Sequence, residues 1–447
     1  MSCTTVDPDN GRRPAEPPRL PPRVTPGVPC YTRVVSQEPR TPTFLSLRYP
    51  GAKLYFAGLT ISMLGSWMQS IALSWLIVRQ LRGGGAELGF QQMAQFLPVA
   101  FLSAWAGSLA DRIDKRRLMV VTQIALGLTA LTLAALDFTG RASLKAVLAI
   151  TVITGFASAF DTPARRSLIG DLVPHDALPN AMALNTGVIT SARVAGVALG
   201  GLLVKYAGTG WCFLLNGLSY LAMIGALFGL ANRAHRTPPA AAGDGVFGAL
   251  VHVWRTRTLM AAMLVTAVIA TFTFNFNVTV TLMVEKVFGL ESDAFGLVMM
   301  FVSVGSFAGA MVSARRHKPT LAGLLFGGLV MGLSCIGIAR APNLWTFGLG
   351  SIPMGFGGGL LMSQLSGLLT MLSPPTMRGR VLALQTVVFL GSTPFGSPVI
   401  GRIADVSGPR SAVSFGGWAA LLGVVGGLLL VGLTPELRRP WLRRLQA

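Results

Sequence analysis

Charged side chains are scarce in this sequence, and acidic ones most of all. Only 12% of the 447 residues are charged, and 17 Asp and Glu stand against 37 Lys and Arg. This scarcity excludes an ordinary soluble domain, in which about 25% of residues are charged. Hydrophobic residues make up 52% of the chain, and 53 residues are glycine. Both values favour a protein that crosses a lipid bilayer many times.

Cysteine and histidine are also few, which excludes several kinds of site. The four cysteines form no CxxC pair, and the four histidines fall in or beside expected loops. We therefore expect no disulfide framework, no metal site and no cofactor. An integral-membrane enzyme would need clustered His, Asp or Ser near one membrane face. No such cluster is visible, so we expect a protein that is not an enzyme.

Twelve apolar stretches are long enough to cross a bilayer, which predicts an all-α membrane protein. Their close spacing leaves no room for a soluble catalytic domain. We place the spans at residues 54–78, 87–110, 118–138, 144–164, 180–205, 210–231, 259–284, 293–313, 320–340, 344–372, 381–404 and 411–434.

The basic residues are unevenly distributed between the two sides of the predicted membrane domain. If the first span starts inside, the inner loops and C-terminal tail hold 19 Lys and Arg, and the opposite side holds 9. This positive-inside bias predicts that both termini are cytoplasmic. It also explains the net charge of +20 by topology and lipid headgroups, without binding to nucleic acid.

A shift of 200 residues aligns the chain with itself. Residues 172–208 match residues 372–408 without a gap, in a pattern of Leu, Pro, Ala-Leu and Gly. Parallel repeats of this kind predict two six-helix halves with a substrate site between them near the bilayer midplane. We expect a disordered Pro/Arg-rich tail over 1–50, halves over 51–231 and 258–434, a cytoplasmic linker over 232–257 and a basic tail over 435–447.

The stretch 271–281 alternates polar and apolar residues with period two, which by itself would indicate a strand. An open strand cannot satisfy its backbone groups in lipid, so we predict a helix. One polar stripe of this helix would face a cavity and the other a neighbouring helix.

The loop GSLADRIDKRR, from Gly107 to Arg117, joins two apolar spans and places about six charges just outside the membrane. It resembles the loop between the second and third helices of major facilitator superfamily transporters. Further segments at 66–69, 160–166, 172–174, 183–185 and 378–381 resemble the branch that includes the enterobactin exporter and related macrolide and drug effluxers. The resemblance covers roughly residues 48–434. It implies the major facilitator fold and a secondary active transporter in a bacterial inner membrane.

Two departures from the family pattern bear on proton coupling. The central Arg that many proton-coupled members carry in helix four is absent from residues 153–158. The antiporter pattern GPxxGG in helix five has Val197 in place of Pro. Protons are nevertheless the coupling ion that the resemblance implies.

The resemblance also implies a conformational latch on the cytoplasmic side. Asp111 would meet the N-terminus of helix eleven, near Arg380, where a helix favours a negative charge. Basic partners such as Arg112 and Arg166 would assist it. The remaining members of the predicted latch are Gly107 and Arg116. The alternative is that these charges serve only to set the topology.

Arg193 lies mid-span on a glycine-lined stripe of helix five that also carries Asn185. An Arg inside the membrane indicates a functional site, and we expect Arg193 to be the only intramembrane cation of the first half. The alternative is a structural ion pair with Asp161 or Asp137. A set of polar and aromatic residues is expected to line the cavity, though each could equally bond a neighbouring helix. These are Trp67, Gln95, Asp161, Asn185, Asn275, Gln364 and Gln385.

Export of a small organic molecule, such as a siderophore, an antibiotic or another drug-like compound, is the function that these features favour. Trp, Phe, Met and amide side chains suit a bulky, largely apolar solute better than a sugar. Uptake of a nutrient by the same fold is the alternative within transport.

Overall fold

The computed structural model describes residues 45–110, 113–174, 176–230, 246–315, 318–374 and 377–433. Residues 1–44 of the tail predicted over 1–50, the tail predicted over 435–447, most of the predicted linker, and Asp111 and Arg112 lie outside these residues. The first half contains α1 Pro50–Trp75, α2 Gly85–Ala110, α3 Lys115–Phe138, α4 Leu144–Leu172, α5 Leu178–Ala207 and α6 Thr209–Gly229. The second half contains α8 Arg257–Phe272, α9 Phe276–Leu282, α10 Ser292–Arg315, α11 Leu321–Ile338, α12 Leu344–Leu372, α13 Arg378–Ser407 and α14 Pro409–Leu433. The helices η1 Leu45–Arg48 and α7 Val246–Arg255 precede α1 and α8, respectively.

The all-α fold class is confirmed, because the described residues form helices and no strand. Eleven helical segments of the described chain are long and apolar enough to cross a membrane. The 26-residue helix α2 lies between the first two of them in the sequence. We call the side where α1 begins the terminal face and the opposite side the distal face.

Local sequence explains where several helices begin. Asp114 accepts hydrogen bonds from the backbone of Arg116 and Arg117 at the start of α3, and Ser143 and Thr320 cap α4 and α11 in the same way. The turns α5–α6 and α13–α14 are each made by one glycine, Gly208 and Gly408, with φ of 93° and 89°. These two glycines are 200 residues apart, so the same left-handed turn recurs in each half.

Glycines bring the helices of each half into direct backbone contact. A Cβ on Gly355 or Gly359 of α12 would overlap a carbonyl oxygen of α10, and one on Gly305 would overlap the Ile352 carbonyl oxygen in return. In the first half, a Cβ on Gly58 would lie 2.9 Å from Ala226 of α6. Packing of this kind drives association in lipid, where hydrophobic transfer contributes little between helices. The contacts fix the helices within each half.

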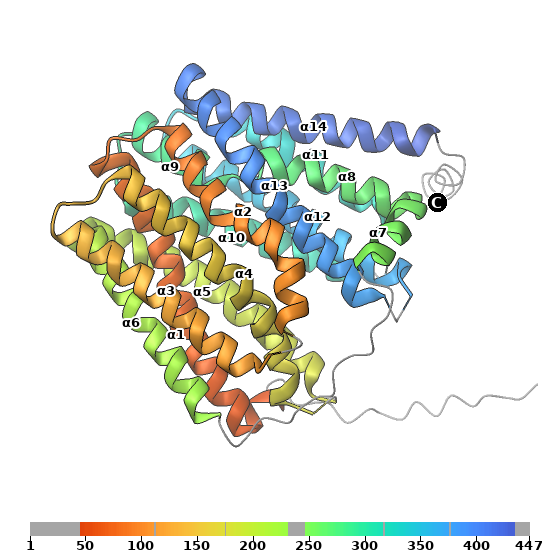
Figure 1. Ribbon diagram of the computed structural model, residues 1–447. Helices are drawn as coiled ribbons and strands as arrows, with labels where there is room; N and C mark the ends of the chain where they lie inside the picture. Colours follow the sequence, from red (N-terminus) through yellow and green to blue (C-terminus); the bar gives the residue numbers. More distant parts are fainter. Residues whose placement is uncertain are drawn as a thin grey trace, which may run out of the picture. The chain divides into compact units, whose positions relative to one another are not determined.

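Two helix pairs make most of the contact between the halves, α2 with α13 and α5 with α10. Figure 1 shows α2, in orange, beside α13, in blue, although they are far apart in the sequence. Both pairs run antiparallel, since Gly85 meets Gly401 while Gly89 meets Ser397, and Gly201 meets Ser292 while Gly296 meets Ala198. The distal ends of all four helices therefore lie in the region where the halves join.

The seventh span is not the continuous helix that we predicted over 271–281. The helix stops at Phe272 and resumes at Phe276, so the prediction is wrong at Thr273–Asn275. Thr273 donates a hydrogen bond to the carbonyl oxygen of Gly416 in α14, and Asn275 occupies the N-cap position of α9. Polar residues that satisfy freed backbone groups make such a break possible inside a membrane.

Each half ends its first span with a π-helical turn, at Leu76–Gln80 and Met283–Val287. The two turns are 207 residues apart and carry Arg79 and Lys286 at equivalent places. Because π-turns are rare and concentrate at functional sites, their recurrence points to the distal face.

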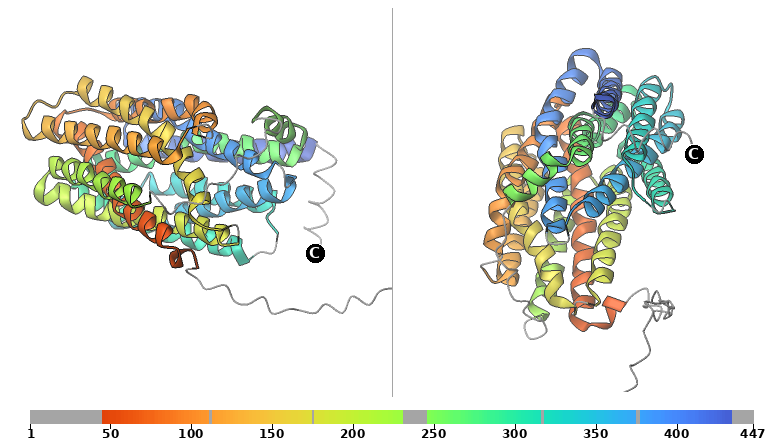
Figure 2. Two further views of the ribbon diagram at one scale, coloured as in Figure 1. Left: turned by 60° about the horizontal axis from the view of Figure 1, so that its bottom comes forward. Right: turned by 90° about the vertical axis from the view of Figure 1, so that its right-hand side faces the viewer.

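The short helix α7 belongs to the terminal face of the second half. It packs against α8 and α13, as the green helix in Figures 1 and 2 shows. Its residues Ala249 and Val253 are buried, while Trp254 is 69% exposed. This two-sided pattern is that of an amphipathic helix, as found at membrane surfaces.

The glycine contacts within a half predict that Gly355→Ala is strongly destabilising. The added Cβ would overlap the Val302 carbonyl oxygen, and a backbone atom cannot rotate away. We expect a clear fall in the thermal unfolding temperature of the purified protein. Gly225→Ala is the matched control, because a Cβ there meets nothing within 4 Å. Equal stability of the two variants would contradict the packing described here.

Candidate functional site

The first contact that closes the distal face is made by Asp405, near the C-terminal end of α13. Its two carboxylate oxygens accept hydrogen bonds of 2.7 Å from the backbone N–H groups of Gly85 and Ala86, at the start of α2. A carboxylate at a helix N-terminus satisfies free donors and complements the helix dipole, for roughly 0.3–1 kcal/mol. Lys286 Nζ lies 3.8 Å from the same carboxylate. Asp405 therefore ties the second half to the first.

The second contact lies at the distal ends of α5 and α10. Lys205 Nζ is 2.9 Å from the Asp293 carboxylate and 3.5 Å from that of Glu291. Ser292 is buried and donates a 2.7 Å hydrogen bond to the carbonyl oxygen of Gly201. Nearby, Arg79 donates to the carbonyl oxygen of Leu290. All of these bonds cross between the halves.

The two contacts are related by the internal repeat, with the charges reversed. Lys205 and Asp405 are 200 residues apart and hold equivalent places in the last turns of α5 and α13. Lys205 meets carboxylates at the start of α10, and Asp405 meets backbone N–H groups at the start of α2. We call these bonds, together with the glycine contacts beside them, the distal seam. The distal seam was not predicted from the sequence, although the 200-residue shift aligns Lys205 with Asp405.

Apolar residues continue the distal seam toward the membrane centre. Trp75 of α1 packs edge-on against Phe295 of α10, with ring centroids 6.2 Å apart. Ile71 and Val197 of the first half belong to one buried cluster with residues of the second half. Asn277 of α9 donates to the Ser70 hydroxyl of α1 at 3.3 Å. The seam therefore combines a few polar bonds with an apolar layer beneath them.

Arg193 lies beside Trp67, and both were predicted to belong to the substrate site. Its guanidinium carbon is 5.9 Å from the centroid of the Trp67 ring, within the range of a cation–π contact. Within the described chain, no carboxylate lies within 4 Å of Arg193. The alternative of an ion pair is not what the structure shows: Asp161 binds Arg165, and Asp137 accepts from Thr209. Trp67 in turn packs on the cluster that the halves share.

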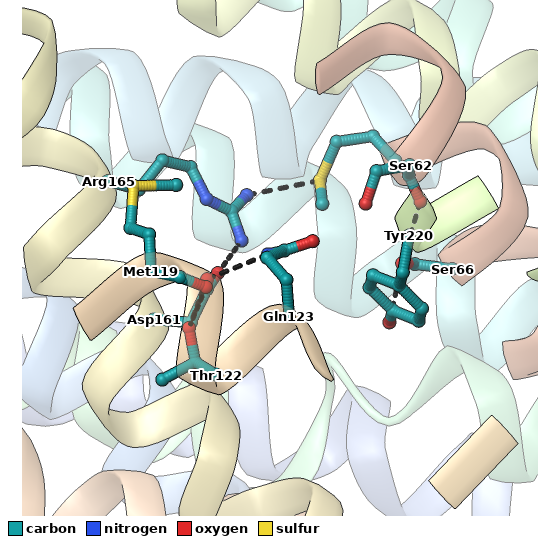
Figure 3. A network of polar contacts seen from close by, with 9 residues as sticks. Ser62, Ser66, Met119, Thr122, Gln123, Asp161, Arg165 and Tyr220 are labelled. Atoms are coloured by element: carbon teal, nitrogen blue, oxygen red, sulfur yellow. Dashed lines mark hydrogen bonds and ion pairs between the residues drawn. The ribbon is translucent and has the colours of Figure 1, made fainter. Parts of the chain in front are cut away.

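Asp161 is buried inside the first half. It accepts hydrogen bonds from Thr122 and Gln123 of α3 and pairs with Arg165 one turn further along α4, as Figure 3 shows. Four buried polar atoms around this pair have no described partner: Tyr55 Oη, Ser62 Oγ, Gln123 Oε1 and Arg165 Nε. The network holds α3 to α4 and does not reach the second half.

This network corrects two expectations. Helix α4 extends to Leu172, beyond the predicted end of its span at residue 164, and so takes Arg165 into the membrane domain. Arg193 is therefore not the only intramembrane cation of the first half. The span predicted over 144–164 ends one residue before Arg165, whose burial is possible because its counter-ion Asp161 lies four residues earlier.

The other predicted cavity residues mostly bond neighbouring helices. Gln91 donates to Gln95 within α2 at 3.0 Å. Gln364 is fully buried, accepts from the backbone of Thr320 and donates to Ser313 of α10. The remaining contacts are those of Gln385 with Ser366 and of Asn275 with Ser397. Asn185 is buried, and its Oδ1 has no partner among the described residues.

The predicted latch is described only in part. Gly107 lies in the last turn of α2, and Arg166 is exposed. Arg116 donates to the carbonyl oxygens of Leu227 and Phe228 and so caps the end of α6 instead of reaching the second half. Lys115, which was not predicted, pairs with Asp171 of α4 at 2.9 Å. Asp111 and Arg112 lie outside the described residues.

Comparison with known proteins places this arrangement in a family. The sequence profile of the family described as "Transmembrane secretion effector", within the major facilitator superfamily, matches residues 44–436. This chain belongs to that family of transporters. The predicted resemblance is therefore confirmed, and the family supports the prediction that the transporter is not an enzyme.

Two relatives and one solved structure illustrate what the transporter is similar to. It is 27% identical to a multidrug efflux pump, Tap, from Mycolicibacterium fortuitum, over 81% of this chain and 90% of the relative. It is 22% identical to the staphyloferrin A transporter of Staphylococcus aureus, over 63% and 73%. A bacterial homologue of the lysosomal transporter Spinster, in an inward-facing conformation, has the same fold, with a TM-score of 0.67 at 17% identity over 85% and 95%.

The distal seam predicts that Asp405→Ala favours opening of the distal face. The variant leaves two N–H groups of α2 without their acceptor and Lys286 without its carboxylate. A cysteine introduced at Ser292, which is 1% exposed, should react several-fold faster with a membrane-impermeant maleimide in this variant than in the parent. Arg402→Ala is the control, because it removes a charge from the same end of α13 without removing a described bond. An unchanged rate in Asp405→Ala would contradict the role of the seam.

The buried Asp161–Arg165 pair predicts a strong asymmetry between single and double variants. Asp161→Leu leaves a buried guanidinium uncompensated and should lower the free energy of unfolding by about 3–5 kcal/mol. Asp161→Leu combined with Arg165→Leu removes both charges and should cost much less. Thermal unfolding of the purified proteins measures this. A double variant as unstable as the sum of both singles would show that the charges are not coupled.

Proposed function

We propose that this transporter exports a small organic molecule across the bacterial inner membrane by alternating access, with the two halves moving against each other. The contacts within each half differ from those between the halves, which supports a movement that separates the halves at the distal seam. Within a half, helices such as α10 and α12 meet mainly through glycine backbone contacts, whereas the distal seam combines its glycine contacts with ion pairs and hydrogen bonds. Ion pairs and hydrogen bonds can exchange with water when the halves separate. Opening is therefore expected at the seam and not within a half.

Arg193 is the observation that carries the proposed substrate site. A guanidinium inside a membrane span is costly unless an anion accompanies it. Within the described chain no carboxylate supplies that charge, and the guanidinium rests against the ring of Trp67. An anionic group of the substrate would supply it, and the indole would contact an apolar or aromatic part. We therefore infer that the substrate is an organic anion with an apolar body.

The break at Thr273–Asn275 supports a site at this depth. Interrupted helices mark binding sites in many secondary transporters, because they free backbone groups near the midplane. Asn275 is held there by Ser397 of α13, and Asn277 bonds to Ser70 of α1. A rearrangement at the break would thus reach α13 and the first half together.

The relatives and the charge pattern support the proposed direction of transport and orientation. Relatives described as a multidrug efflux pump and a staphyloferrin A transporter favour export of siderophores or drug-like compounds over nutrient uptake. The positive-inside bias supports cytoplasmic termini, which would make the terminal face cytoplasmic. We propose protons as the driving ion. Asp111, supported by its motif, is proposed to latch the cytoplasmic side against the start of α13.

The substrate site predicts that Arg193→Ala abolishes export while the protein still folds. Loss of the guanidinium removes the charge proposed to bind the anionic group, and Arg193→Lys should retain part of the activity if charge alone matters. Efflux of a radiolabelled or fluorescent organic anion from loaded proteoliposomes is the measurement.

Thr393→Ala is the control, since Thr393 holds the equivalent place in the second half and is neutral. It should export at close to the parental rate. A well-folded Arg193→Ala protein that exports at the parental rate would rule out the proposed site. Loss of folded protein in both Arg193 variants would instead assign this residue to the scaffold.

The proposed orientation predicts the location of both ends of the second half. Reporter fusions after Arg236 and after Ala447 should both indicate cytoplasm, because the basic loops remain inside. A fusion after Gly140, in the turn between α3 and α4, serves as the opposite control and should indicate the outer side. A periplasmic signal from either of the first two fusions would overturn the orientation.

A further inference from the structure

An apolar groove of about 540 Å3 lies on the outer surface of the first half, between α1, α5 and α6. Ile61, Leu199, Leu202 and Leu215 are among the residues that line it, and they are 42–50% exposed. These residues belong to membrane-spanning segments. The groove therefore opens toward the lipid and not toward the seam between the halves.

The floor of the groove offers no free polar group. Gly65 forms part of the floor and brings α1 close to α6, since a Cβ at this position would lie 2.5 Å from Ser219 Oγ. Ser219 already donates to the carbonyl oxygen of Asn216 at 2.7 Å, and Asn216 donates to Gln69 of α1. The amide and hydroxyl groups beneath the groove are thus satisfied by one another. An occupant would need apolar surface and no hydrogen bonds.

The depth of the groove matches one leaflet of a bilayer. Gly196 meets Leu64 and Gly200 meets Met68, so Ile61 is level with residue 193 of α5. From there to Tyr206, at the other end of the groove, is roughly 20 Å along the helix. One leaflet of the hydrocarbon core is about 15 Å thick. Tyr206 is 79% exposed, as expected for an aromatic residue at the membrane interface.

We propose that this groove binds one acyl chain of a phospholipid from the distal leaflet. Its apolar walls, its satisfied floor and its extent from the interface to about the midplane all fit a single extended chain. The contacts of Gly196 and Gly200 with α1 close the wall between the groove and Arg193, so the occupant does not enter the proposed substrate site. The headgroup remains at the distal interface, beside Tyr206.

Photo-labelling tests the proposal directly. The full-length protein is reconstituted in vesicles of phosphatidylethanolamine and phosphatidylglycerol that contain a phosphatidylcholine with a diazirine on one acyl chain. After illumination, labelled peptides are identified by mass spectrometry. The groove segments of α1, α5 and α6 should carry about fivefold more label than other lipid-facing helix surfaces. A modest factor is expected because packing, and not hydrophobic transfer, distinguishes the groove from surrounding lipid.

Variants that fill the groove provide the decisive comparison. The double variant Leu199→Trp, Leu202→Trp fills the groove from α5, and the single variant Leu215→Trp fills it from α6. If one of these variants folds poorly, the other provides the test. Each should reduce groove labelling to the level of other helices. Val399→Trp is the matched control, because Val399 lies 200 residues beyond Leu199 and is 44% exposed. It should leave the labelling of the groove unchanged.

Two results would overturn the proposal. One is uniform labelling of all lipid-facing helices in the parent protein, which would make the groove an ordinary surface. The other is protection of the groove together with a dimeric mass in native mass spectrometry that the filling variants convert to a monomer. That result would assign the groove to a second copy of this chain.

Discussion

The close approach of α2 to α13 at the distal face is the constraint on which the arrangement of the two halves depends. Gly85 and Gly401 lie backbone to backbone, and any side chain at either position would overlap the carbonyl oxygen of the other. Only at this separation can Asp405 reach two N–H groups of α2. Two small residues and one carboxylate thus decide where the halves meet. Because α2 and α13 are antiparallel, their contact continues along both helices to Gly89 and Ser397.

The same constraint recurs at α5 and α10 through different chemistry. Gly201 approaches Ser292, and Lys205 meets carboxylates where Asp405 meets backbone donors. The repeat preserves the position of each contact and reverses its charge. A helix N-terminus accepts a carboxylate directly but needs its own acidic residues to accept a lysine. Asp293 and Glu291 supply them, which accounts for the different sequences of two structurally equivalent ends.

Much of the fold could be predicted because the bilayer restricts what a sequence can form. Long apolar segments had to be helices, and the 200-residue shift aligned Gly208 with Gly408, which form the equivalent turns. The break at Thr273–Asn275 was not predicted, and one of its contacts is with a partner far along the chain, the carbonyl oxygen of Gly416, which accepts a hydrogen bond from the Thr273 hydroxyl. A single helix carries no signal for a partner of that kind.

The candidate site was predicted less well, for a related reason. Trp67 and Arg193 were chosen separately and do lie together. Gln364 and Asp161 were chosen for their polarity inside a span, but their bonds are to neighbouring elements of the same half. A polar residue in a membrane helix needs a partner in either case, and its identity alone does not say whether that partner is protein or substrate. Asp405 was overlooked because a carboxylate beside a loop looks like a solvated charge.

The measurement that tests this account most directly is the distance between the halves at the distal face. Spin labels at Arg141, in the first half, and Ser407, in the second, report it by double electron–electron resonance in proteoliposomes. In the parent protein we expect a population at short distance that corresponds to the closed seam. Removing both charges with Lys205→Ala and Asp405→Ala should shift the distribution to longer distances. An unchanged distribution would contradict the claim that these residues hold the distal face closed.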